Sequence, residues 1–114
     1  MPATRNLCTA LSITATGAQP GIRLNTTPLH GGFGREGMLQ LAAAVGGSGT
    51  VLIQGHPSPL STLPASGDAA WSTILTLTSA SKLRQEIPDL PYWIRVNVSV
   101  VGTGTVTIDL EGTT

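Results

Sequence analysis

Two histidines, His30 and His56, are the side chains in this sequence best suited to proton transfer near neutral pH. Each lies beside glycine or proline, which places both in predicted loops. A zinc site needs several ligands, and no cluster of histidine and acidic residues has helical or hairpin spacing. A catalytic base needs an oriented nucleophile, and no Gly-x-Ser-x-Gly motif occurs. We therefore expect no metal, no cofactor and no catalytic residue, and we interpret both histidines as contact residues at a surface or subunit interface.

A glycine-rich segment, residues 32–37, matches the G-x-G-x-x-G pattern of dinucleotide-binding sites. Such a site needs a strand before the motif, a helix after it and an acidic residue about 20 positions further on. Residues 28–30 (Pro-Leu-His) make a poor buried strand, and residues 52–57 contain no acid. We therefore interpret the segment as a glycine-rich loop that presents Phe33 and Arg35.

Asp109 and Glu111 lie two positions apart, on one face of a predicted strand. Paired carboxylates serve glycoside hydrolysis when separate segments bring them together in a cleft. We interpret this pair instead as a solvated face whose charge is balanced by Arg95 on a neighbouring strand. Cys8, the single cysteine, lies in an apolar run and is interpreted as a small buried side chain.

The few aromatic residues divide between the two faces of predicted strands. Trp71 alternates with leucines, which makes it the candidate for the core. Trp93 alternates with Arg95 and Asn97, so it is predicted on a polar face, where a loop or a partner protein would cover it. An exposed row including Tyr92 and Trp93 would instead make a platform for stacking on sugars.

Composition narrows the function classes further. Only 11% of the 114 residues are charged and the net charge is zero, which argues against nucleic-acid binding, because that affinity rests on several phosphate contacts. No stretch of about 18 apolar residues predicts a membrane span, and the N-terminus lacks the apolar core of a secretory signal. We expect synthesis in a cytoplasm, no membrane contact, and a tendency to associate with other subunits.

The elements that must position these residues are strands. High threonine and valine content, alternating apolar runs and frequent glycine and proline predict an all-β chain. We expect one domain, residues 1–114, folded as an antiparallel β-sandwich of jelly-roll type with seven or eight strands. An N-terminal arm (1–6), a long Pro/Gly loop (55–67) and tight hairpins at 46–49 and 102–104 complete the prediction. Strands are predicted at 7–15, 22–26, 38–45, 50–54, 71–78, 92–101 and 105–111, with a helix as the alternative at 38–45.

Three segments of residues 68–112 resemble small β-sandwich proteins of tailed bacteriophages, in particular capsid decoration (cement) proteins. They are 71–77 (WSTILTL), 90–98 (LPYWIRVNV) and 102–112 (GTGTVTIDLEG). The resemblance is a pattern of strands and includes no catalytic signature. It implies a non-enzymatic homo-oligomer, a dimer or trimer, that is made in the cytoplasm of a bacterial host. It also implies that the oligomer binds the major capsid protein on the outer surface of the virion.

The resulting prediction is a structural protein that stabilises a capsid. One alternative is a component of a phage tail, neck or fibre, and another is a carbohydrate-binding module that uses Trp93, Tyr92 and Asn97. An enzyme would need a pocket that joins a histidine to Asp109 or Glu111. The candidate interface residues are Arg5, His30, Phe33, Arg35, His56, Trp93 and Arg95.

Overall fold

The computed structural model describes residues 4–24, 36–58 and 60–112, and in these ranges it contains strands and no helix. The prediction of an all-β antiparallel sandwich is confirmed. The described residues therefore include no helix that could span a membrane. The strands are β1 (Thr4–Ser12), β2 (Gly17–Ala18), β3 (Ile22–Arg23), β4 (Gly37–Leu41), β5 (Thr50–His56), β6 (Ser72–Leu77), β7 (Arg84–Ile87), β8 (Trp93–Val100) and β9 (Thr105–Gly112).

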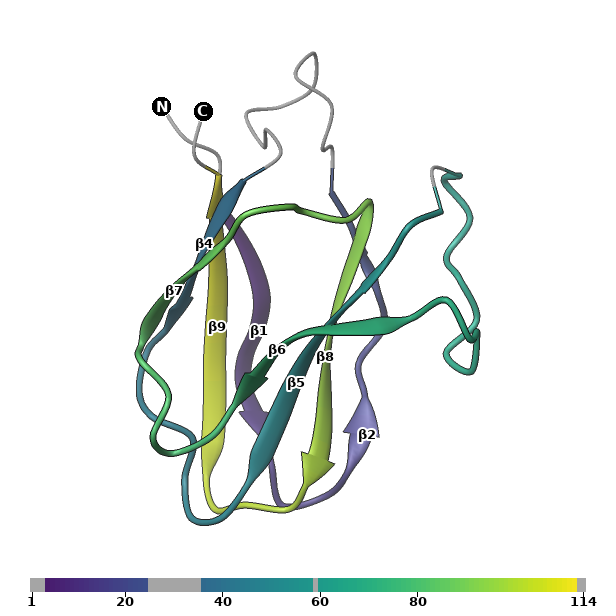
Figure 1. Ribbon diagram of the computed structural model, residues 1–114. Coiled ribbons are helices and arrows are strands. Elements are labelled where there is room, and N and C mark those ends of the chain that lie inside the picture. Colours follow the sequence, from purple (N-terminus) through teal and green to yellow (C-terminus); the bar gives the residue numbers. More distant parts are fainter. Residues whose placement is uncertain (1–3, 25–35, 59, 113–114) are drawn as a thin grey trace.

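Two sheets form by nested pairing of the chain (Figure 1). One sheet has the order β1-β9-β4-β7 and the other has the order β2-β8-β5-β6, with β3 also paired to β8. The first strand thus pairs with the last, β2 and β3 pair with β8, and β5 pairs with β6. The jelly-roll form stays a prediction, because this order agrees with it only when β2 and β3 count as two pieces of one strand.

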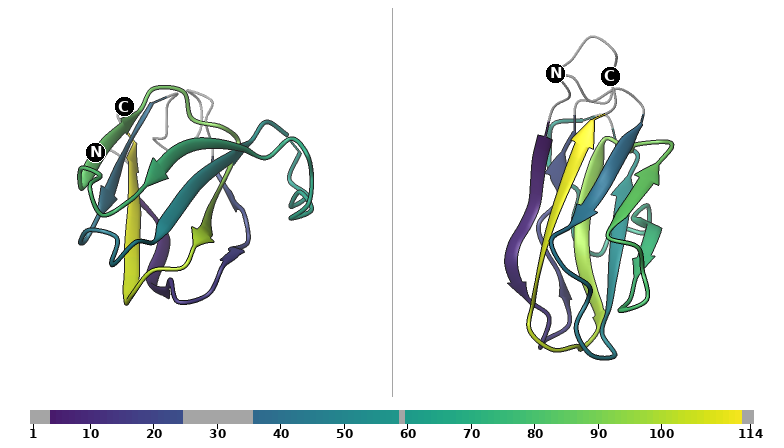
Figure 2. Two further views of the ribbon diagram at one scale, coloured as in Figure 1. Left: turned by 60° about the horizontal axis from the view of Figure 1, so that its bottom comes forward. Right: turned by 90° about the vertical axis from the view of Figure 1, so that its left-hand side faces the viewer.

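The two predicted tight hairpins are wrong. Residues 46–49 and 102–104 do not join paired strands; each carries the chain from one sheet to the other (Figure 2). The two connections touch, since the Thr103 N–H donates to the Gly46 carbonyl at 3.2 Å. Glycine permits this approach, because a Cβ on Gly102 would lie 2.5 Å from the Gly46 oxygen.

The core lies between the sheets and follows the predicted alternation for most of its length. Inward-facing residues of β8 and β9, such as Val96 and Ile108, are buried as expected. Val100 is an exception with 48% exposure, because the register between β5 and β8 shifts at Thr50 and Val51. A shift of one residue turns the following side chains to the other face of the sheet.

A second irregularity moves Trp71 out of the core, contrary to the prediction. Opposite β5, the register passes from Leu75 directly to Thr73, so Ile74 is an extra residue in β6. Leu75 packs against the core, whereas Thr73 lies on the outer face, where the Gln54 side chain donates to its hydroxyl. Beyond the bulge Trp71 also lies on the outer face, and its indole N–H donates to the Ala65 carbonyl.

Several predicted boundaries also change. Residues 4–6 of the predicted arm belong to β1, because Thr4 pairs with Glu111 of the last strand. The predicted strand 38–45 is a strand, as favoured, but it ends at Leu41. The long loop begins after His56, because Gly55 and His56 continue the pairing of β5 with β8.

Candidate functional site

The structure brings His56, Trp93 and Arg95 together on the outer face of the β2-β8-β5-β6 sheet, and these three residues are called the cluster below. Residues 57–58 and 60–71, called the covering loop below, lie between β5 and β6 and extend past the edge of the sandwich before they return (Figure 1). Side chains from β5 and β8 bind this loop. Hydrogen bonds and a cation–π contact from these side chains hold the loop against the sheet.

Trp93 joins β8 to the covering loop. It is buried, with 5% exposure, and its indole N–H donates to the Leu60 carbonyl at 3.1 Å. The guanidinium of Arg23 lies 5.9 Å from the Trp93 ring and donates to the same carbonyl. Of the two predicted covers for Trp93, a loop or a partner protein, the structure shows the loop. The Trp93 side chain is therefore not exposed for contact with a partner.

Arg95 is buried beside Trp93 rather than exposed, with 6% exposure. Its Nε donates to the Gln54 side-chain oxygen and one Nη donates to the Ser66 carbonyl, both at 2.9 Å. Its guanidinium also stacks over the Trp71 ring, 4.2 Å from the centroid. Desolvation under the loop lowers the pKa of Arg95 from its usual value, because burial penalises the charged form.

His56 holds the start and the end of the covering loop. Its Nδ1 accepts a hydrogen bond from the Ser58 backbone N–H at 3.1 Å. Its Nε2 lies 3.4 Å from the Asp68 carboxylate, without the alignment of a hydrogen bond, and its ring meets the Trp71 ring edge-on at 5.1 Å. The bond from the Ala70 N–H, and then His56, lowers the pKa of Asp68. The Nδ1 lone pair already accepts the hydrogen bond from Ser58, so His56 anchors the loop and its Nδ1 is not available as a base.

Asp109 and Glu111 lie on the other sheet, so the predicted charge pairing with Arg95 is wrong. Asp109 accepts a hydrogen bond from the Asn6 amide at 2.8 Å, and Glu111 accepts one from the Gln40 amide at 2.7 Å. Both face outward on β9, since Ile108 and Leu110 face the core. The structure does not bring His56 to these carboxylates, because the two sheets separate them.

Arg5 and Cys8 do not join His56, Trp93 and Arg95. His30, Phe33 and Arg35 lie outside the described residues. Arg5 is exposed on β1, opposite Leu110 of β9. Cys8 is half-buried against the core, and this burial raises the pKa of its thiol.

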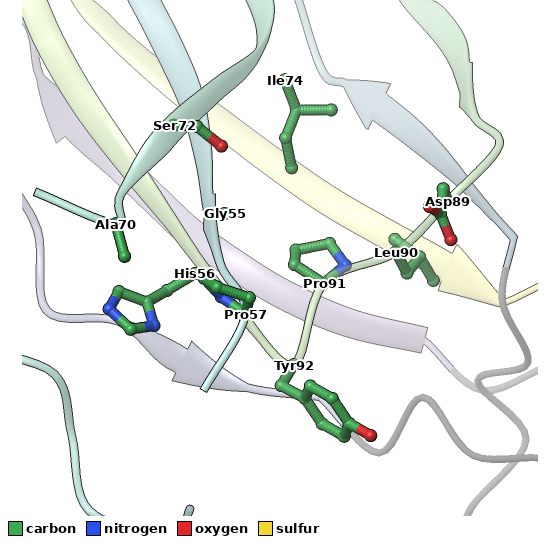
Figure 3. Close-up of a pocket in the computed structure, with 10 residues that line it drawn as sticks. All are labelled: Gly55, His56, Pro57, Ala70, Ser72, Ile74, Asp89, Leu90, Pro91 and Tyr92. Carbon is green, nitrogen blue, oxygen red and sulfur yellow. The ribbon is translucent and has the colours of Figure 1, made fainter. Parts of the chain in front are cut away.

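A cavity of about 370 Å³ lies next to the cluster (Figure 3). The His56 ring and the Asp89 carboxylate lie at opposite ends of it, with Pro91 between them. The described part of the chain contains no group of three histidine, cysteine or acidic residues placed to hold a metal ion. The cavity lining is Gly55, His56, Pro57, Ala70, Ser72, Ile74, Asp89, Leu90, Pro91 and Tyr92.

Sequence reasoning missed the loop partners of this cluster: Leu60, Ser66 and Asp68. Two of them act through backbone carbonyls, which carry no sequence signal. A weak signal did exist, because Gln54 alternates with apolar residues along β5 and shares its face with Arg95 across the strand pair.

Comparisons with protein-family models, with curated proteins and with solved structures found no match.

Proposed function

We propose that this chain is a structural virion protein, a capsid decoration protein that binds the outer surface of a major capsid protein shell and stabilises it. The observation that carries the proposal is the covering loop. It is fastened to the sheet through Trp93, Arg95 and His56, yet it leaves Leu60 65% exposed and Leu63 49% exposed. A loop held in place before binding loses less conformational entropy when a partner covers its apolar side chains.

The polar surface of the sandwich is consistent with burial in an assembly. Outward positions on the strands carry hydroxyl groups in place of lysine or glutamate, as at Thr73, Thr76 and Thr105, all exposed. An uncharged hydroxyl costs less to desolvate than an ion. Many copies on one shell would also convert a modest contact per copy into firm retention.

The alternatives differ in their support. The carbohydrate-binding module needs an exposed aromatic row, and Trp93 is buried beneath the covering loop. The alternative of a tail, neck or fibre component differs from a decoration protein by its place in the particle. Locating the chain in the density of purified particles separates these two structural roles.

The proposal is tested by adding the purified protein to expanded capsids that lack it and measuring the temperature of heat disruption. Wild-type protein is expected to raise that temperature. The double variant Leu60→Asn/Leu63→Asn is expected to lose the effect, because it replaces the exposed apolar side chains of the loop. Leu83→Asn is the matched control, since Leu83 is 46% exposed at a site outside the loop.

Each of these exposed substitutions should change the free energy of unfolding by less than about 0.5 kcal/mol. Loss of capsid binding would therefore not reflect loss of the fold. No stabilisation by the wild-type protein, or its presence inside tails, would overturn the proposal.

A further inference from the structure

Arg95 is a buried cation that has no acidic partner among residues 4–24, 36–58 and 60–112. Its hydrogen-bond acceptors, the Gln54 amide oxygen and the Ser66 carbonyl, are both neutral. Within the described ranges the carboxylate that approaches a basic side chain is that of Asp68, and it faces His56 rather than Arg95. Buried charges in proteins are usually paired, because an unpaired one loses hydration without a compensating attraction.

Arg95 also has hydrogen-bond donors that no described residue accepts. A guanidinium has five N–H groups, and the contacts to Gln54 and Ser66 use two of them. Its second terminal nitrogen, Nη2, makes no hydrogen bond to the residues that the structure describes. The remaining donors belong to the terminal nitrogens, whose planar fork suits the two oxygens of a carboxylate.

A second cavity adjoins this guanidinium. Its volume is about 230 Å³, roughly the volume that seven or eight molecules occupy in liquid water at about 30 Å³ each. That is room for one acidic side chain and is below the usual size of a site for a drug-sized ligand. The cavity is lined by Ala18, Gln19, Pro20, Gly21, Leu63, Pro64, Ser66, Trp71 and Arg95.

We propose that this cavity binds a carboxylate, supplied by an aspartate or glutamate side chain of a partner protein. The apolar parts of Trp71, Leu63 and Pro20 would contact the stem of that side chain, and Arg95 would bind its head. The cavity offers one cation, which suits a single carboxylate better than a chain of phosphates. This inference concerns the ligand class of one cavity and does not depend on whether the partner is a capsid.

The test is an NMR titration that follows the Trp71 indole N–H, whose ring stacks on Arg95. The probe is glutamate blocked at both ends (Nα-acetyl, N-methylamide), and the blocked glutamine analogue is its neutral isostere. The acid is expected to shift the Trp71 signal saturably, and the isostere should bind roughly ten- to a hundredfold more weakly. Equal binding by both probes would overturn the proposal, as would tighter binding of inorganic phosphate or of propionate.

Variants decide whether the effect belongs to this cavity. Arg95→Gln should abolish the shift, and Arg84→Gln should leave it unchanged, since Arg84 is exposed on β7 of the other sheet. If Arg95→Gln does not fold, Ala18→Leu serves in its place, because Ala18 is exposed at the cavity wall and a larger side chain there would fill it. Undiminished binding by a folded Arg95→Gln or Ala18→Leu protein would refute the site.

Discussion

At the scale of single residues, Trp93 and Asp68 show how the covering loop is held. Trp93 comes from the sheet and reaches a loop carbonyl, whereas Asp68 comes from the loop and reaches a sheet histidine. The two contacts differ in chemistry. One is a buried apolar side chain with a single hydrogen bond, and the other is a partly exposed carboxylate whose charge depends on pH.

Trp93→Ala should lower the free energy of unfolding by about 3 kcal/mol, because it removes a buried aromatic side chain. Trp93→Phe keeps most of the apolar contact and loses the hydrogen bond to Leu60, so about 1 kcal/mol is expected. Urea denaturation measures both values. An unchanged midpoint for Trp93→Ala would show that the side chain is not covered in solution.

Asp68→Asn should make the protein less stable near neutral pH and remove part of its sensitivity to acid. The pKa of Asp68 is lower in the folded protein than in the unfolded chain, first because of the Ala70 N–H and then because of His56. The carboxylate therefore adds stability above the unfolded pKa of about 4, and this stability is lost as the pH falls through the lower folded pKa.

The measurement is the difference in Tm between wild-type protein and Asp68→Asn across a pH series. This difference should be largest near neutral pH and should disappear in strong acid. A difference that grows on acidification would contradict the assignment of the lowered pKa to Asp68.

At the scale of elements, small irregularities decide which side of a sheet a residue occupies. The extra residue at Ile74 in β6 places Trp71 outside, and the register shift at Thr50 and Val51 leaves Val100 exposed. The connections between the sheets matter equally, since the β4–β5 and β8–β9 segments meet backbone to backbone.

Gly102→Ala should lower the free energy of unfolding by about 1–3 kcal/mol, because the new Cβ would lie 2.5 Å from the Gly46 oxygen and 2.9 Å from the Gly49 Cα. Both neighbours are backbone atoms, so no side-chain rotation relieves the overlap. Gly67→Ala is the control, since a Cβ there meets nothing within 4 Å. The control should be neutral or stabilising by up to about 1 kcal/mol in the same urea measurement.

At the scale of the whole molecule, nested pairing makes the two sheets interdependent. β1 and β9 come from opposite ends of the chain and pair in one sheet, and β8, which directly precedes β9, belongs to the other sheet. Neither sheet is therefore a continuous part of the chain. We expect the sandwich to unfold as one cooperative unit.

This expectation can be checked with the two tryptophans, Trp71 and Trp93, which both report on the covered face of one sheet. Their fluorescence and the far-UV circular dichroism of the entire chain should change together in urea. Matched midpoints and slopes are the expected result. An earlier fluorescence transition would mean that the covering loop opens while the sandwich remains folded.

Much of the fold follows from local pattern. Alternation in β8 and β9 predicts the buried residues Val96, Val98, Val106 and Ile108, because strand side chains alternate between faces. The site was less predictable. The sequence predicts Trp93 and Arg95 on a polar face, and they do lie there. It does not predict that the loop covers them, because both side chains donate to backbone carbonyls of the loop, which carry no sequence signal.

By itself, the sequence determined that the chain is all-β, where most strands lie and which face of β9 is buried, since each depends on residues near one another. Tertiary structure alone decided which strands pair, so that 102–104 links two sheets and Arg95 lies far from the carboxylates of β9. It also decided which tryptophan is covered. The physical reason is that a bulge of one residue reverses every later side chain, and its position depends on the partner strand.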